Sequence, residues 1–487
     1  MDNRPNILFI MPDQLRWDFV GAYGQNFAQT PNIDALAAQG TVFERCLSPS
    51  PVCIPARASM LTGHNSISTG VLSNNYWLRP DHEACGVPSF ASLLSKAGYH
   101  TEAIGKMHFI PWDITEGFEK RTIAEDKRHI HIRDDYHDYL AEHGLKKYDG
   151  RDEPGYTEGR MASISLVPLE HQVDTWVGDR CVDFLETYDD EAPFLLWSAF
   201  PGPHDPYNPP ADILEGIGET MPDALPATPE TQKFRDEMIN THLHGSAGVD
   251  ISQFTPAMKQ RIRRHYQALI SMIDTQIGAM MKALAARDDG RETLIIFASD
   301  HGDFLGDFDF LGKVLFFENS MRVPMIVAGA GTPRGRSDAL VSLTDVFATI
   351  TKAANVPCAL QDSQPLPEIG LGDARRQWVM GATDKGYMIS GAQWKLSRYR
   401  NGVCVLHDVV ADPGEQTNRW DDPSVLGLRD EMDRELQAWI IASTLDGHKE
   451  KSYPYMTMTP DHPGHKRGWR RTYPANGWAD DVKQGLT

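Results

Sequence analysis

The chain has 487 residues, with 47 Lys or Arg against 67 Asp or Glu, which gives a formal net charge of −20. This acidic balance argues against nucleic acid as a partner, and no stretch is apolar for long enough to cross a membrane. A chain of this length can bury a substantial core, and we expect one large unit and a smaller one.

Four short apolar runs predict strands that are buried on both faces of a mostly parallel sheet. The runs cover residues 6–11, 101–105, 194–200 and 294–299. The polar residues that follow them are, in the same order, Asp13 and Gln14; Lys106 and His108; His204; and Asp300 and His301. In an open parallel sheet, ligands bind beyond the carboxyl ends of the strands. We therefore expect these polar residues to line one crevice.

The stretch from Cys53 to Gly63 predicts a short helix that begins at a cysteine. Pro55 suits a first helical turn because it lacks an N–H, and Gly63 can end a helix in the left-handed conformation. Arg57 lies one turn beyond Cys53 on the same face. A nucleophile at Cys53 would lie at the positive end of the helix dipole, beside a guanidinium able to grip a tetrahedral anion with two hydrogen bonds. These residue types favour attack on a sulfate or phosphate ester.

The polar residues after the first and last runs are candidate metal ligands. Asp13, Gln14, Asp300 and His301 make an oxygen-rich set with one imidazole, which suits calcium, magnesium or manganese better than zinc. Taken singly, Asp13-Gln14 is typical of a helix cap and Asp300-His301-Gly302 of a turn after a strand. Taken together with Cys53, they favour a divalent cation.

The C-x-P-x-R sequence from Cys53 to Arg57 resembles the signature of the sulfatase family, part of the alkaline phosphatase superfamily. In that family the cysteine is oxidised to formylglycine by a modifying enzyme. For an isolated motif, a buried cysteine at a helix start is the alternative. A thiolate phosphatase is excluded, since its loop needs an arginine six positions after the cysteine, where Ser59 stands. Further segments resemble the family in the same order along the chain: 4–8, 30–34, 299–324, 394–396 and 406–418.

The resemblance implies a fold, a reaction and a role for each site residue. The fold would be an alkaline-phosphatase-like α/β domain, with a mixed, mostly parallel sheet between helices, and a smaller C-terminal α+β domain. The reaction would be hydrolysis of sulfate esters by a formylglycine nucleophile formed from Cys53. Lys106 and Lys313 would bind the sulfate oxygens, with Lys313 and His204 near the leaving oxygen and His108 as the base. One divalent ion, with Ca²⁺ or Mn²⁺ favoured over Mg²⁺, would be held by Asp13, Gln14, Cys53, Asp300 and His301.

Some positions depart from the commonest sulfatase pattern. Ala56 stands where Ser or Thr is common. The pairs Asp13-Gln14 and Asp300-His301 resemble the pairs found in the branch of the family that includes phosphonate monoester hydrolases. Hydrolysis of phosphonate monoesters or phosphodiesters by the same machinery is therefore the alternative function, although Lys106 and His108 favour sulfate. A non-catalytic metal-binding homologue is a further alternative, which the retention of all six catalytic residues disfavours.

Domain limits are predicted at 1–370 for the catalytic domain and 371–445 for the smaller domain, with 446–487 as an arm that takes part in oligomer contacts. A homo-oligomer is expected, with a small sulfate or phosphonate ester and the formylglycine-generating enzyme as partners. The start of the sequence shows no signal peptide, and the six cysteines are scattered, which favours the cytoplasm.

Two further segments carry structural predictions. The spacing of apolar residues from Tyr266 predicts an amphipathic helix that ends near Gly290. Residues 127–133 alternate polar and apolar side chains, which is typical of a half-exposed strand and favours a solvated face over a metal site.

Overall fold

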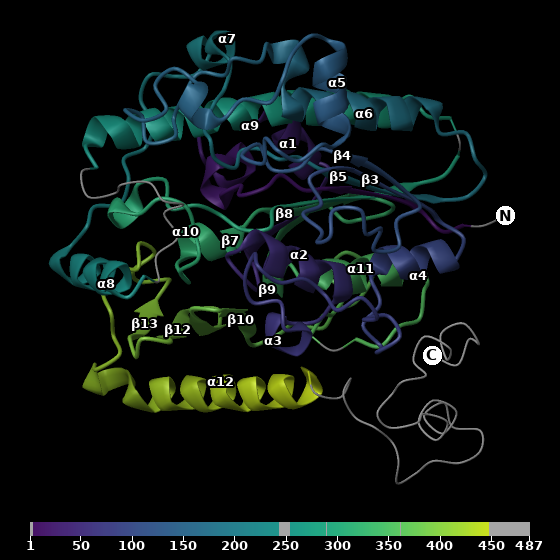
Figure 1. Cartoon of the computed structure of the whole chain (residues 1–487). Helices are drawn as coiled ribbons and strands as arrows, with labels where there is room; N and C mark the ends of the chain where they lie inside the picture. The colour runs from purple at the N-terminus through teal and green to yellow at the C-terminus, as the bar shows by residue number, and fades with distance from the viewer. Residues whose placement is uncertain (1–2, 243–253, 289, 361, 448–487) are drawn as a thin grey trace, which may run out of the picture.

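The computed structural model describes residues 3–242, 254–288, 290–360 and 362–447 (Figure 1). A nine-stranded sheet lies at its centre, in the order β4-β3-β5-β1-β6-β8-β2-β7, with β9 paired to β2. The neighbours from β4 to β6 run parallel, and β8 is antiparallel to β6. The strands are β1 (Asn6–Ile10), β2 (Gly40–Leu47), β3 (His100–Gly105), β4 (Lys120–Ile123), β5 (Phe194–Ala199), β6 (Thr293–Ala298), β7 (Arg322–Val323), β8 (Met325–Gly329) and β9 (Gly335–Ser342).

Helices cover both faces of this sheet (Figure 1). Successive side chains of a strand point to opposite faces, so Leu8 and Ile10 of β1 pack in one core and Ile7 and Phe9 in another. The helices are α1 (Pro31–Ala37), α2 (Cys53–Thr62), α3 (Ser66–Thr69), α4 (Phe90–Lys96), α5 (Asp135–Glu142), α6 (Val173–Thr187), α7 (Ala211–Glu215), α8 (Pro229–Asn240), α9 (Pro256–Ala285), α10 (Glu318–Met321), α11 (Asp345–Ala353) and α12 (Leu426–Gly447). Within the described residues, no helix combines the length and apolarity that a membrane span requires.

The four apolar runs form β1, β3, β5 and β6, as the sequence predicts. The amphipathic helix is present as α9 but begins earlier than predicted, at Pro256, and ends at Ala285. It starts there because Thr255 caps the helix by accepting the N–H of Met258, and because proline fits the first helical position. The mixed, mostly parallel sheet between helices confirms the predicted fold class.

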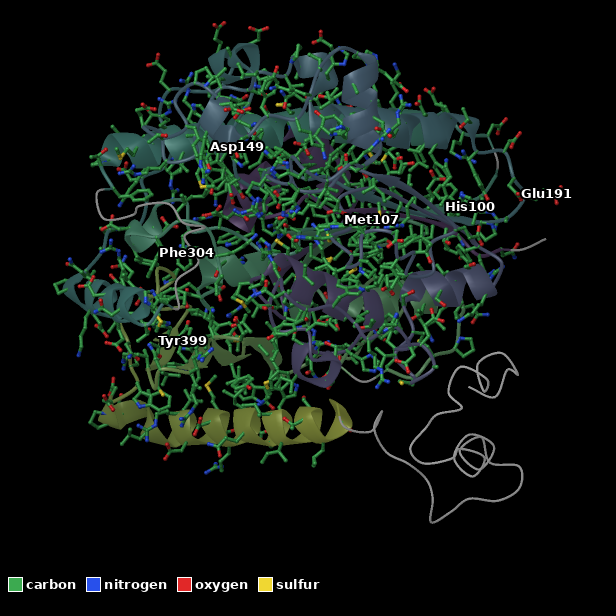
Figure 2. The ribbon with its side chains drawn as sticks, viewed as in Figure 1. His100, Met107, Asp149, Glu191, Phe304 and Tyr399 are labelled. Atoms are coloured by element: carbon green, nitrogen blue, oxygen red, sulfur yellow. The ribbon has the colours of Figure 1, made fainter. Side chains whose placement is uncertain are left out.

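A second, four-stranded antiparallel sheet follows the large one in the sequence. It comprises β10 (Val379–Thr383), β11 (Gly386–Ser390), β12 (Trp394–Tyr399) and β13 (Cys404–Asp408). Helix α12 covers this sheet and shares a core with it (Figure 1). Figure 2 shows Tyr399 in the small sheet and Met107 in the interior of the large unit. The predicted domain limits at 370 and 445 remain predictions, and nearly all of the predicted arm, 448–487, lies outside the described residues.

Candidate active site

The residues predicted to line one crevice lie together beyond the carboxyl ends of the parallel strands of the large sheet. Asp13 and Gln14 follow β1, and Asp300 and His301 follow β6, its parallel neighbour. The others come from the start of α2 and from the segments after β3, β5 and β6. All are buried except Lys313, which is half-buried; the complete set is Asp13, Gln14, Cys53, Arg57, Lys106, His108, His204, Asp300, His301 and Lys313.

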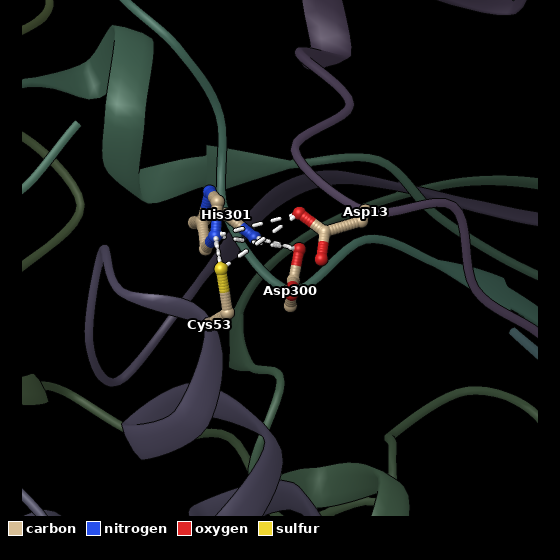
Figure 3. A group of neighbouring side chains, drawn as sticks. All are labelled: Asp13, Cys53, Asp300 and His301. Atoms are coloured by element: carbon tan, nitrogen blue, oxygen red, sulfur yellow. Dashed lines mark hydrogen bonds and ion pairs between the residues drawn. The ribbon is translucent and has the colours of Figure 1, made fainter. Parts of the chain in front are cut away.

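Four of these residues form a compact cluster of possible metal ligands, called the metal-type cluster below. The ligand atoms of Asp13, Cys53, Asp300 and His301 all lie within 4.8 Å of one another (Figure 3). His301 Nε2 is 3.2 Å from Cys53 Sγ and 3.8 Å from Asp13 Oδ1. Because His301 Nδ1 donates to the carbonyl oxygen of Gly302 at 3.0 Å, Nε2 is left as the ligand atom. Two carboxylates and one imidazole fit a hard divalent cation.

Gln14 adds a neutral oxygen beside this cluster. Its backbone, with a φ of 68°, donates an N–H to Asp300 Oδ1 at 2.9 Å. Its side-chain Nε2 donates to Asp303, so that Oε1 faces Lys313 Nζ at 2.7 Å. Asp303 is held in place by the hydroxyl of Tyr207, which donates to it at 2.5 Å. The protein therefore fixes the amide orientation that a metal ligand at Gln14 requires.

Arg57 is fully buried and pairs with two carboxylates of the metal-type cluster. Its Nε donates to Asp300 Oδ2 at 3.0 Å, its Nη2 donates to Asp13 Oδ2 at 2.9 Å, and its Nη1 donates to the carbonyl oxygen of Lys106. Burial lowers the pKa of Arg57, but Asp300 and Asp13 outweigh burial and raise it. In the structure the guanidinium donates to the two carboxylates of the metal-type cluster. The two-pronged grip on a tetrahedral anion stays a prediction.

Lys106 is also fully buried among carboxylates. Its Nζ lies 2.8 Å from Asp13 Oδ2 and 3.0 Å from Asp126 Oδ2. Burial lowers the pKa of Lys106, but Asp126 and Asp13 outweigh burial and raise it above its usual value. The ammonium is therefore charged, and it adds to the positive potential around Cys53.

Lys313 belongs to the segment just before α10, and its side chain lies among the candidate ligands. Its Nζ is 2.9 Å from Cys53 Sγ, 3.0 Å from His301 Nε2 and 2.9 Å from His204 Nε2. Since His204 Nδ1 donates to the carbonyl oxygen of Asp205 at 2.8 Å, its Nε2 accepts from Lys313. Lys313 thus contacts the thiol directly and links it to the ring of His204.

Cys53 opens α2 at the centre of this charge. The carbonyl Oδ1 of Asn74 accepts the N–H of Ile54 at 3.0 Å, which satisfies one of the free donors at the helix start. Burial raises the pKa of Cys53, but Lys313, His301 and Lys106 outweigh it and hold the pKa well below its usual value; a hydrogen bond from the His108 ring adds to this lowering. Any nucleophile at this position gains the same stabilisation of negative charge.

Residues 127–133 form turns, so the prediction of a half-exposed strand there is wrong. Strand β4 ends before them, at Ile123. The side chain of Asp126 then accepts the backbone N–H of Arg128 at 2.9 Å and closes a turn. Local hydrogen bonding by an aspartate therefore overrides the alternating pattern.

Sequence reasoning also missed residues that contact the predicted site. Arg128 pairs with Asp126 at 2.8 Å and with Asp205 at 3.3 Å, and its Nη2 is 3.3 Å from His204 Nε2. The signal was the pair Glu125-Asp126, which follows β4 just as the other polar residues follow their strands. Strand β4 went unrecognised because its sequence, Lys-Arg-Thr-Ile, is not an apolar run.

Comparison with known proteins agrees with this geometry. A sequence model of the sulfatase family matches residues 5–356. The chain is 31% identical to an arylsulfatase of Clostridium perfringens, over 85% of this chain and 90% of the relative. It is 29% identical to a choline-sulfatase of Rhizobium meliloti, over 86% and 83% of the two chains. The fold is similar to the crystal structure of a phosphonate monoester hydrolase of Agrobacterium radiobacter, with a TM-score of 0.79, 23% identity and coverage of 90% and 96%. The chain belongs to the sulfatase family, a family of sulfuric ester hydrolases.

Proposed function

We propose that the protein hydrolyses sulfate esters with a formylglycine nucleophile formed from Cys53. The observation that carries this proposal is the position of the thiol, which is fully buried at the start of α2 and lies 2.9 Å from Lys313 Nζ. A cysteine that only capped a helix would need no such cations. A hydroxyl of the hydrated aldehyde would need them, because the oxygen becomes negatively charged when it gives up its proton in order to attack.

In the first step, one hydroxyl oxygen of the hydrated formylglycine gives up its proton and bonds to the sulfur of the ester, and the bond from sulfur to the alcohol oxygen breaks. One proton is thus lost from the nucleophile and one is gained by the leaving oxygen. Lys313 and His204, 2.9 Å apart, are placed to hold the proton that the leaving oxygen takes up. A divalent cation held by Asp13, Gln14, Asp300, His301 and the modified Cys53 would orient the hydroxyl and neutralise charge on the ester.

In the second step, His108 removes the proton from the remaining hydroxyl of the sulfated residue. The carbon–oxygen double bond of the aldehyde forms again, and the bond from carbon to the sulfate oxygen breaks. His108 suits this role because its ring is close enough to Cys53 to help lower the pKa of the thiol, and because imidazole titrates close to neutrality. Water then hydrates the aldehyde and restores the nucleophile.

Peptide mass spectrometry tests the nucleophile. Protein made in a host with a competent modifying enzyme should carry formylglycine at Cys53, and the specific activity of different preparations should follow the modified fraction. Full activity in protein that carries only unmodified cysteine would refute this mechanism. In active protein, elemental analysis should find one divalent ion per chain, with calcium or manganese favoured.

A substrate panel tests the ester. We expect 4-nitrophenyl sulfate or choline sulfate to have a higher kcat/KM than a phenylphosphonate monoester or a phosphodiester with the same leaving group. The reason is that a sulfated hydroxyl must collapse by elimination, for which a positioned base such as His108 is useful. If phosphonate monoesters had a higher kcat/KM than every sulfate tested, phosphonate hydrolysis would be the function. The role proposed for the metal-type cluster would not change.

A further inference from the structure

The proposed base, His108, has a backbone conformation that residues other than glycine rarely adopt. Its φ is 61°, in the left-handed region. Such a residue persists only where its surroundings hold it, and these residues gather at active sites. Within the part of the chain that the structure describes, no group forms a hydrogen bond with Nδ1 of the ring. Its direction therefore depends on the backbone and on the rings packed around it.

Glu125 holds this backbone. Its Oε1 accepts the N–H of His108 at 3.0 Å, and both residues are buried. The backbone N–H of Glu125 donates in turn to Asp134 Oδ2 at 2.9 Å. Asp134 pairs with Lys147 at 2.6 Å and caps α5 by accepting the N–H of His137. The turn at His108 is thus tied through Glu125 to the start of a helix.

Two aromatic rings confine the side chain of His108. The Trp112 ring lies nearly parallel to it, with 6.1 Å between centroids and 10° between planes. The His129 ring meets it at 5.9 Å and 69°. Burial lowers the pKa of His129 to about 4, so this neighbour is neutral at neutral pH. These rings limit rotation of the imidazole but do not hold its backbone.

The carboxylate of Glu125 is poorly compensated for a buried charge. Burial raises its pKa, and the charges of His108, Lys106 and Arg57 lower it by less. Oε2 has no hydrogen-bond partner among the described residues. The next residue, Asp126, is by contrast paired with Lys106 and with Arg128. Burying a carboxylate with so few partners opposes folding, which points to a role for Glu125 other than stability.

We infer that Glu125 is a positioning residue, which holds the His108 backbone in the left-handed turn that aims the imidazole at position 53. The inference rests on the proposed role of His108 as the base. Glutamine at position 125 would keep the accepting oxygen, and alanine would remove it. The two variants therefore separate the hydrogen bond from the charge.

Burst kinetics of the variants test the effect on the base. With the ester that the wild-type enzyme cleaves fastest, Glu125→Ala should slow breakdown of the covalent intermediate about 100-fold, because a misplacement of about 1 Å costs this much. Glu125→Gln should lose less than about tenfold, and KM should change little in both. Adding Glu125→Ala to His108→Ala should slow breakdown no further, since the base is already absent.

The control variant is Glu153→Ala, which removes a buried carboxylate that accepts hydrogen bonds from Ser163 and Asn208. In this variant the rate of breakdown of the covalent intermediate, divided by its rate of formation, should equal the wild-type value.

Crystal structures of the variants give a readout that does not depend on activity. The turn at His108 should keep a positive φ in Glu125→Gln and lose it in Glu125→Ala. An unchanged turn and ring direction in Glu125→Ala would overturn the inference, as would further slowing of the His108→Ala enzyme by the second change. A preference of the wild type for phosphonates would instead overturn the proposed substrate, and the Glu125 comparison would then be made with a phosphonate.

Discussion

Lys395, in β12, is a fully buried cation that joins the small sheet to the large unit. Its Nζ lies 3.0 Å from Glu318 Oε1 and 2.7 Å from Glu415 Oε1, and both carboxylates are buried. Glu318 is the first residue of α10 and follows Lys313 closely in the sequence. The backbone N–H of Glu318 donates to Glu415 Oε2 at 2.6 Å. The change Lys395→Met removes the charge, nearly conserves the volume and leaves two buried carboxylates without their shared partner.

The structure gives the size of the expected loss. Burial raises the pKa of Glu318, but Lys395 and then Arg45 outweigh it and lower the pKa from 4.5 to about 2. Since one pKa unit corresponds to about 1.36 kcal/mol, this lowering stabilises the fold by about 3 kcal/mol. The pKa of Glu415 is lowered too, because Lys395 outweighs burial there as well. Removing one partner of a buried pair costs about 3–5 kcal/mol, and we expect a loss of stability in this range.

Urea unfolding followed by tryptophan fluorescence measures this loss. A lowered carboxylate pKa stabilises the fold fully above the unfolded pKa of about 4.5, and the contribution disappears as the pH falls through about 2. The difference between Lys395→Met and wild type should therefore be largest at neutral pH and shrink below pH 4.5. The control is Lys96→Met, which changes an exposed lysine whose half-buried partner Glu83 is 2.7 Å away; it should lose less than about 1 kcal/mol. A Lys395→Met loss no larger than that of the control would refute the reasoning.

Two further changes probe the site and its helix. Asp303→Ala should weaken metal binding about 10- to 100-fold, because Gln14 loses the acceptor that orients its amide; competition with a chelator measures this, and an unchanged dissociation constant would contradict it. Gly63→Ala should lower the melting temperature, since residue 63 has a φ of 72° and a Cβ there would lie 2.6 Å from Phe347 Cδ1. A melting temperature equal to wild type would show that the end of α2 tolerates a side chain.

The sequence predicts the parallel strands well because they are buried on both faces, so each reads as an apolar run. Edge strand β4 is half-exposed and carries no such run, and the residues after it were missed with it. The partners of Arg57 were beyond sequence reasoning for another reason. They lie 44 and 243 residues away along the chain, and spacing within α2 reveals only which face the guanidinium shares with Cys53, not what that face meets.

The arrangement of charge explains how this acidic protein can accept an anionic ester. Arg57 and Lys106 are fully buried, and their charges are matched by Asp13, Asp126 and Asp300. Lys313 is half-buried, and the contacts of its Nζ among the described residues are with Gln14 Oε1, Cys53 Sγ and the rings of His204 and His301, with no carboxylate among them. We therefore expect Lys313 to meet the ester directly, and contact of Lys106 with the sulfate oxygens stays a prediction. The buried pairs have the separate task of holding the carboxylates of the metal-type cluster in place, so that a cation bound there would supply the remaining positive charge.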